Sequence, residues 1–106
     1  MSLPKCLSQS NNVPAIGVLT LDIHVEYSHS LKEKRHVVKS LKDRLRERFN
    51  VSVAEIDHLD SWQNSVVAAV TVSNDRVRAE QVLQAVESHA ASVLGGALAG
   101  TAIEWI

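Results

Sequence analysis

Two pairs of polar residues occupy alternate positions in predicted strands, where their side chains could do chemistry. Asp22 and His24 lie two residues apart in one segment, and Glu55 and Asp57 do so in another. Because side chains two residues apart on a strand point to the same face, each pair should project from one face. The order of elements suggests that the two strands are neighbours, which would bring the pairs together. Such a group could bind a divalent metal or supply a general acid and base.

No other feature of the sequence supports this chemistry. The chain contains no H-E-x-x-H motif, paired C-x-x-C, calcium loop, P-loop or dinucleotide fingerprint. The single cysteine, Cys6, lies far in sequence from any histidine, so a Cys–His nucleophile is not indicated. His58, beside Asp57 and Asp60, is typical of a hairpin residue with local hydrogen bonds. We therefore predict a protein that is not an enzyme and that has no catalytic residue, cofactor or metal.

Positive charge is concentrated in one predicted helix. Residues 28–49 hold eight of the eleven Lys and Arg residues of a chain whose formal net charge is -1. Several of these cations fall in a stripe that spans about 80° of the helix surface. They are Lys32, Arg35, Lys39, Lys42 and Arg46. Such a stripe suits the phosphates of RNA or an acidic protein partner, and it could equally be an ordinary solvated helix face.

Two periodicities alternate along the chain and define the elements that carry these residues. Helical spacing predicts one helix of about 20 residues after Ser30, which stands three positions before Glu33 as in a capping box. A second helix is predicted between Ser73 and Gly95. Alternating or β-branched segments predict strands at 15–26, 51–58, 62–73 and 100–106. The order β-α-β-β-α-β predicts an α+β, ferredoxin-like sandwich, with two helices on one face of a four-stranded antiparallel sheet.

Apolar stripes on the two predicted helices should face the core of this sandwich. The stripes consist of Leu31, Val38, Leu41, Leu45 and Phe49 in the first helix and of Val77, Val82, Leu83, Val86, Ala90 and Val93 in the second. Trp62 and Trp105 lie at strand ends, where a core position is favoured over a subunit interface or base stacking. The other face of the sheet, which includes Val18, is left uncovered. A homodimer that covers this face is predicted, with small-ligand binding there as an alternative.

The length of 106 residues fits one domain. Residues 1–14 are rich in Ser, Asn and Gln and lack the apolar segment of a signal peptide. They are predicted to form a flexible N-terminal tail before a single domain at 15–106. No apolar run approaches the roughly 20 residues needed to cross a bilayer. A cytoplasmic protein without membrane contact is therefore expected.

Short motifs occur along the chain in a distinctive order. They are G-V-L-T-L at 17–21, S-L-K-E-K-R at 30–35, N-V-S-V-A-E at 50–55, D-H at 57–58, W-Q at 62–63 and S-N-D at 73–75. Over residues 15–106 this combination resembles the YlxP-like family of small bacterial proteins of unknown function. The resemblance implies a ferredoxin-like fold. Because family members are often encoded beside genes for translation initiation and ribosome maturation, it also implies a ribosome-related role.

Together, the basic stripe and the resemblance lead us to expect a non-enzymatic accessory protein of translation or ribosome maturation. It would contact RNA or the ribosome through phosphates bound to the first helix. The alternative is a protein-interaction module or homodimer that recognises an acidic protein partner with the same stripe.

Overall fold

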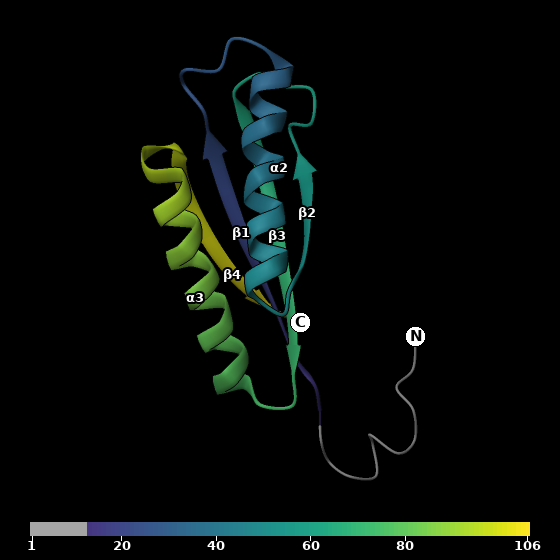
Figure 1. Ribbon diagram of the computed structural model, residues 1–106. Helices are drawn as coiled ribbons and strands as arrows, with labels where there is room; N and C mark the ends of the chain where they lie inside the picture. The colour runs from purple at the N-terminus through teal and green to yellow at the C-terminus, as the bar shows by residue number, and fades with distance from the viewer. Residues whose placement is uncertain (1–12) are drawn as a thin grey trace.

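The computed structural model describes residues 13–106, so the predicted tail at 1–14 lies outside the described residues except for Val13 and Pro14. The chain follows the predicted order β-α-β-β-α-β, with one short 3-10 helix before the last strand (Figure 1). The elements are β1 (Ala15–His24), α2 (Leu31–Arg48), β2 (Ser52–Asp57), β3 (Asn64–Ser73), α3 (Arg76–Leu94), η1 (Gly95–Ala97) and β4 (Leu98–Trp105). Within residues 13–106, no helix has the length and apolar character needed to cross a bilayer.

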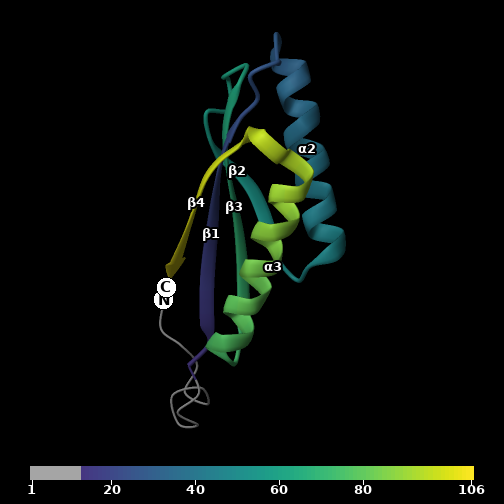
Figure 2. The ribbon, with the colours of Figure 1, turned by 90° about the vertical axis from the view of Figure 1, so that its left-hand side faces the viewer.

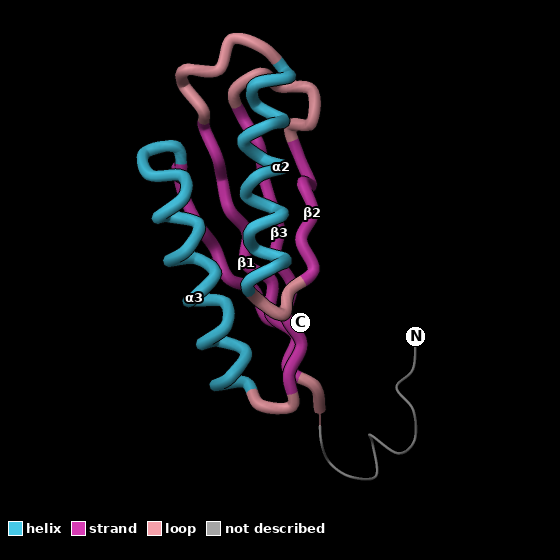
Figure 3. Tube along the Cα trace, in the orientation of Figure 1, coloured by secondary structure: helices cyan, strands magenta, loops and turns pink. Residues whose placement is uncertain are grey.

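The strands form one antiparallel sheet in the order β2-β3-β1-β4. Both helices cover the same face of this sheet, and no described element covers the other face (Figure 2). The long axes of the helices run beside the strands, with the loops gathered at the two ends (Figure 3). The predicted ferredoxin-like sandwich is confirmed.

The core lies between the sheet and the helices, as the apolar stripes predict. Leu41 and Leu45 of α2 are fully buried. In α3 the buried residues are Ala79, Leu83, Val86 and Ala90, whose spacing of four, three and four keeps them on one side of the helix. The prediction is wrong for Val77, which is exposed. It precedes Ala79 by two positions, which places it about 200° around the helix from the buried side.

Side-chain caps fix where the two helices begin. The Ser30 hydroxyl accepts a hydrogen bond from the Glu33 backbone N–H at 3.1 Å. The Glu33 carboxylate in turn accepts from the backbone N–H of His29, so the reciprocal bond reaches one residue further back than in a standard capping box. Asp75 caps α3 by accepting from the Val77 N–H. Gly95, with φ of 57°, ends α3 in the left-handed conformation that glycine allows.

The two tryptophans have different environments. Trp105 packs beside the core over Gly17, where an added Cβ would lie 2.9 Å from the indole ring. The Arg76 guanidinium carbon lies 4.4 Å from the centroid of the Trp105 ring. Trp62 instead is 60% exposed, so the core prediction is wrong for this residue. It lies in the loop between β2 and β3, outside the strands whose side chains pack against the helices.

Candidate functional site

The predicted basic stripe lines a groove between α2 and β2. Arg35, Lys39, Lys42 and Arg46 surround a hollow of about 350 Å³, which we call the basic groove. The lining is completed by Val38 and by two carboxylates, Asp43 and Glu55. Lys32 lies one turn before Arg35, so it extends the row of cations toward the N-terminal end of α2. The structure therefore brings the predicted cations together on one side of the helix.

Two of these cations are already engaged by the protein. The Lys39 ammonium lies 2.9 Å from a carboxylate oxygen of Asp43. This hydrogen bond lowers the pKa of Asp43, which therefore stays ionised. The Arg46 guanidinium donates to the backbone carbonyl of Val53 at 2.7 Å, a contact that attaches α2 to β2. Within residues 13–106, Lys32, Arg35 and Lys42 form no ion pair and remain available to an anion.

A buried lysine stands behind the groove. Lys34 has a fully buried side chain, and its ammonium lies 2.9 Å from a carboxylate oxygen of Glu55. The same ammonium donates to the backbone carbonyls of His58 at 2.9 Å and Leu59 at 3.3 Å. The three donor protons of Lys34 thus have three acceptors, and the first turns of α2 are tied to β2 and to the loop that follows it.

Glu55 is held as a carboxylate by its partners. Burial would raise the pKa of Glu55, but the hydrogen bonds from Lys34 and Ser65 and the positive charge of Lys34 outweigh it and lower the pKa. The Ser65 hydroxyl donates to Glu55 at 2.5 Å. The charge of Glu55 is therefore already balanced by Lys34, so this carboxylate weakens the positive potential of Arg35 and Lys42 in the basic groove only slightly.

The burial of Lys34 was not predicted from the sequence, where this residue is one of several cations in a basic segment. The spacing carried an indication, because Lys34 precedes Val38, Leu41 and Leu45 at steps of four, three and four. This is the position of a core residue on the buried side of α2. A lysine at such a position requires a buried acceptor, and Glu55 supplies it.

A second hollow, of about 370 Å³, lies between the two helices. It is lined by Arg44, Glu47 and Arg48 of α2 and by His89 of α3. The sequence did not predict it because it depends on how α3 packs against α2. The cations here lie on the side of α2 away from the basic groove, so they provide a matched comparison for it.

The predicted cluster of Asp22, His24, Glu55 and Asp57 does not form. β3 lies between β1 and β2, so the two pairs are on strands that are not neighbours. Glu55 faces the helices and binds Lys34, whereas Asp22 and His24 lie on the uncovered face. The register shifts between Glu55 and Asp57, so these two residues do not share a face either. Among residues 13–106, no group of three or more His, Cys, Asp or Glu side chains is placed to hold a metal ion.

The uncovered sheet face is built around small side chains. Paired positions place Ala54, Ala68, Thr20 and Ala102 in one row across the four strands. Val18 lies in the next row, between Val70 and Glu104. The centre of this face thus carries small, mostly apolar side chains, while Asp22 on the central strand β1 lies in the next row on the other side of Thr20.

The chain resembles known proteins in sequence and in fold. Residues 16–101 match the model of a family described as protein of unknown function, DUF503. The chain is 39% identical over 71 residues to the uncharacterized protein YlxP of Bacillus subtilis (strain 168), an alignment that covers 67% of this chain and 77% of that protein.

Two solved structures share the fold at low sequence identity. The designed protein Foldit4 matches with a TM-score of 0.55 and 10% identity, over 89% of this chain and 97% of that one. A C-terminal segment of the alpha subunit of aIF2 from Pyrococcus abyssi matches with a TM-score of 0.50 and 16% identity, over 96% of this chain and 55% of that one. At these identities the two matches concern the fold alone.

Proposed function

Because this chain belongs to the YlxP-like family of proteins of unknown function, DUF503, we propose its function from its own surface. It is a non-enzymatic, cytoplasmic accessory protein that contacts RNA phosphates through the basic groove. The observation that carries this proposal is the row of cations along one side of α2, of which Lys32, Arg35 and Lys42 have no ion-pair partner within residues 13–106. The ribosome-related part of the role follows from the family resemblance.

The distribution of charge supports a phosphate ligand. Residues 30–49 carry eight basic and three acidic side chains, which gives 8 - 3 = +5. The remainder of the chain carries three basic and nine acidic side chains, which gives 3 - 9 = -6. A molecule with this asymmetry approaches a polyanion with α2 foremost, because its other surfaces repel the polyanion.

The geometry of the groove also suits a phosphate backbone. From Lys32 to Arg46 the row of cations extends over about 21 Å at the helical rise of 1.5 Å per residue. Its charges are spaced at one or two turns, so successive phosphates of one strand can each meet a cation. The contacts of Arg46 with Val53 and of Lys34 with Glu55 hold the two walls together before a ligand arrives.

Replacing Lys32, Arg35 and Lys42 together by Gln should weaken RNA binding roughly tenfold or more at low salt, with little dependence on RNA sequence. Gln supports a helix, and Lys32 and Arg35 are exposed, so folding should be preserved. Fluorescence anisotropy with a labelled RNA of mixed sequence measures the affinity, and circular dichroism checks the fold.

The control replaces Arg44, Arg48 and Arg78 by Gln, which removes the same charge from outside the basic groove. This control should bind RNA nearly as tightly as the unmodified protein. Equal losses of RNA affinity in the two variants would show that binding depends only on net charge. A larger loss of affinity in the control would indicate that RNA binds at the hollow between the helices. Binding of an acidic protein in place of RNA would favour the alternative partner.

We also propose that a second copy of the chain covers the uncovered sheet face. The row of Ala54, Ala68, Thr20 and Ala102 has no bulky side chain, which allows two sheets to pack face to face at the usual distance of about 10 Å. A two-fold axis would place the same apolar row on both sides of the interface. Small-ligand binding on this face is the alternative if the protein is a monomer.

Replacing Val18 by Glu should weaken this dimer by about 100-fold or more, because symmetry buries the new charge twice, each time beside Glu104. Analytical ultracentrifugation of the protein and the variant measures the change. Replacing the exposed Val77 by Glu adds the same charge to the helix layer and should leave the dimer intact. An unmodified protein that sediments as a monomer at all concentrations would contradict the proposal.

A further inference from the structure

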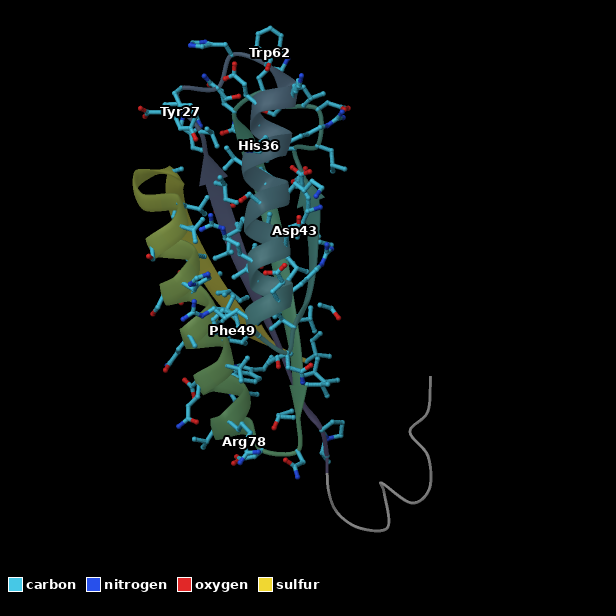
Figure 4. All side chains as sticks on the ribbon, in the orientation of Figure 1. Tyr27, His36, Asp43, Phe49, Trp62 and Arg78 are labelled. Atoms are coloured by element: carbon cyan, nitrogen blue, oxygen red, sulfur yellow. The ribbon has the colours of Figure 1, made fainter. Side chains whose placement is uncertain are left out.

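Trp62 is an exposed aromatic residue whose position the core does not explain. Its side chain is 60% exposed, and Tyr27 is the other exposed aromatic residue of the four that the chain contains. Both lie at the same end of the molecule (Figure 4). A tryptophan left in solvent can offer its large, flat ring to a ligand.

The loop that carries Trp62 is held in place on both sides of this residue. The Gln63 side-chain amide donates to the backbone carbonyl of Glu26 at 3.1 Å, and the backbone carbonyl of Gln63 accepts from the Val25 N–H at 2.8 Å. On the other side, the Lys34 ammonium binds the carbonyl of Leu59. Trp62 is therefore presented from a constrained backbone, which reduces the entropy lost when a ligand packs on its ring.

The same contacts place Trp62 at the end of the basic row. Lys34 lies on the first turns of α2, where the basic row begins with Lys32, and its buried ammonium binds the carbonyls of His58 and Leu59 in the loop that contains Trp62. Tyr27 lies on the other side of α2, where it lines a hollow of about 230 Å³ with His36 and Arg44. Of the two exposed aromatic residues, Trp62 is therefore the one whose loop is attached to the end of α2 where the basic row begins.

A row of cations with an exposed indole in the loop near its end matches the chemistry of single-stranded nucleic acid. Proteins that bind single strands combine a positive groove along the backbone with aromatic side chains on which bases stack. A duplex offers its phosphates to the same cations but keeps its bases stacked on one another. We infer that Trp62 is a base-stacking platform and that the ligand of the basic groove is a single-stranded segment of RNA. This inference rests on the proposed function.

The test compares Trp62→Leu, Trp62→Phe and Tyr27→Leu against one RNA of mixed sequence, used as a single strand and annealed to its complement. Trp62→Leu should weaken binding of the single strand about 5- to 150-fold and leave duplex binding within about twofold. Trp62→Phe should keep most of the affinity, because a phenyl ring still stacks. Tyr27→Leu should bind both RNAs as the unmodified protein does. Circular dichroism confirms that each variant is folded.

The outcomes separate this inference from the proposed function. If Trp62→Leu binds the single strand normally while the groove variant loses affinity, the stacking role is overturned and the phosphate contact stands. Equal losses with the single strand and the duplex, or equal losses in Trp62→Leu and Tyr27→Leu, would also overturn the stacking role. If the unmodified protein binds neither RNA at low salt, both proposals fail.

Discussion

Replacing Lys34 by Met should lower the free energy of unfolding by about 3 kcal/mol, toward the lower end of the range for removing one partner of a buried ion pair. Met fills the space of the lysine stem but leaves the Glu55 carboxylate, which is only 13% exposed, without its cation. The carbonyls of His58 and Leu59 lose a donor as well. Urea denaturation of the two proteins at neutral pH measures the difference.

The double variant Lys34→Met, Glu55→Leu provides the control. It should be more stable than Lys34→Met alone, because it leaves no buried charge unpaired. The pKa of Glu55 is lowered from its ordinary value of 4.5, so the pair stabilises the fold fully above that pH, and the stabilisation is lost as the pH falls through the folded pKa. The destabilisation by Lys34→Met should therefore shrink in acid. A pH-independent loss, or a double variant as unstable as the single one, would contradict this role of the pair.

Replacing Leu41 by Ala should cost about 2–5 kcal/mol of unfolding free energy, the usual range for a leucine deleted from a packed core. Leu41 is fully buried between α2 and the sheet. Leu59→Ala is the matched control, because Leu59 is 52% exposed and its truncation should change stability by less than about 0.5 kcal/mol. Thermal and urea unfolding of both variants measure the contrast. Similar effects at the two positions would mean that the buried side of α2 is wrongly assigned.

The fold could be predicted because each element is specified locally. Alternation in 15–26 and the helical spacing of Leu41 and Leu45 depend only on which residues follow one another. Ser30 and Gly95 mark helix ends by chemistry that acts within a few residues, and both do so in the structure. The order of strands then follows from the connection rules for this sequence of elements.

The sites could be predicted only where they depend on a single element. The stripe from Lys32 to Arg46 follows from helix geometry alone. By contrast, the grouping of Asp22 with Glu55 failed. The connection rules already place β3 between their strands, and the register and the bulge that decide which face each side chain takes depend on long-range pairing. The pairing of Lys34 with Glu55 was missed for the same reason, since it joins residues 21 positions apart.

The exposure of Trp62 also depends on long-range packing. A tryptophan near the start of a predicted strand is the type of residue expected in a core. The residues next to it in sequence do not indicate whether a helix covers that position. In the structure it lies in the β2–β3 loop at the end of the molecule, which leaves its ring in solvent (Figure 4).

The salt dependence of RNA affinity tests the central claim most directly. The logarithm of the association constant for a single-stranded RNA should fall linearly with the logarithm of salt concentration, since bound counterions are released. At about 0.7 per phosphate contact, replacing Lys32, Arg35 and Lys42 by Gln should make this slope shallower by about 2, while the Arg44, Arg48, Arg78 control should leave it nearly unchanged. An unchanged slope in the groove variant, or no binding by the unmodified protein at the lowest salt, would show that the basic groove is only the solvated side of a helix.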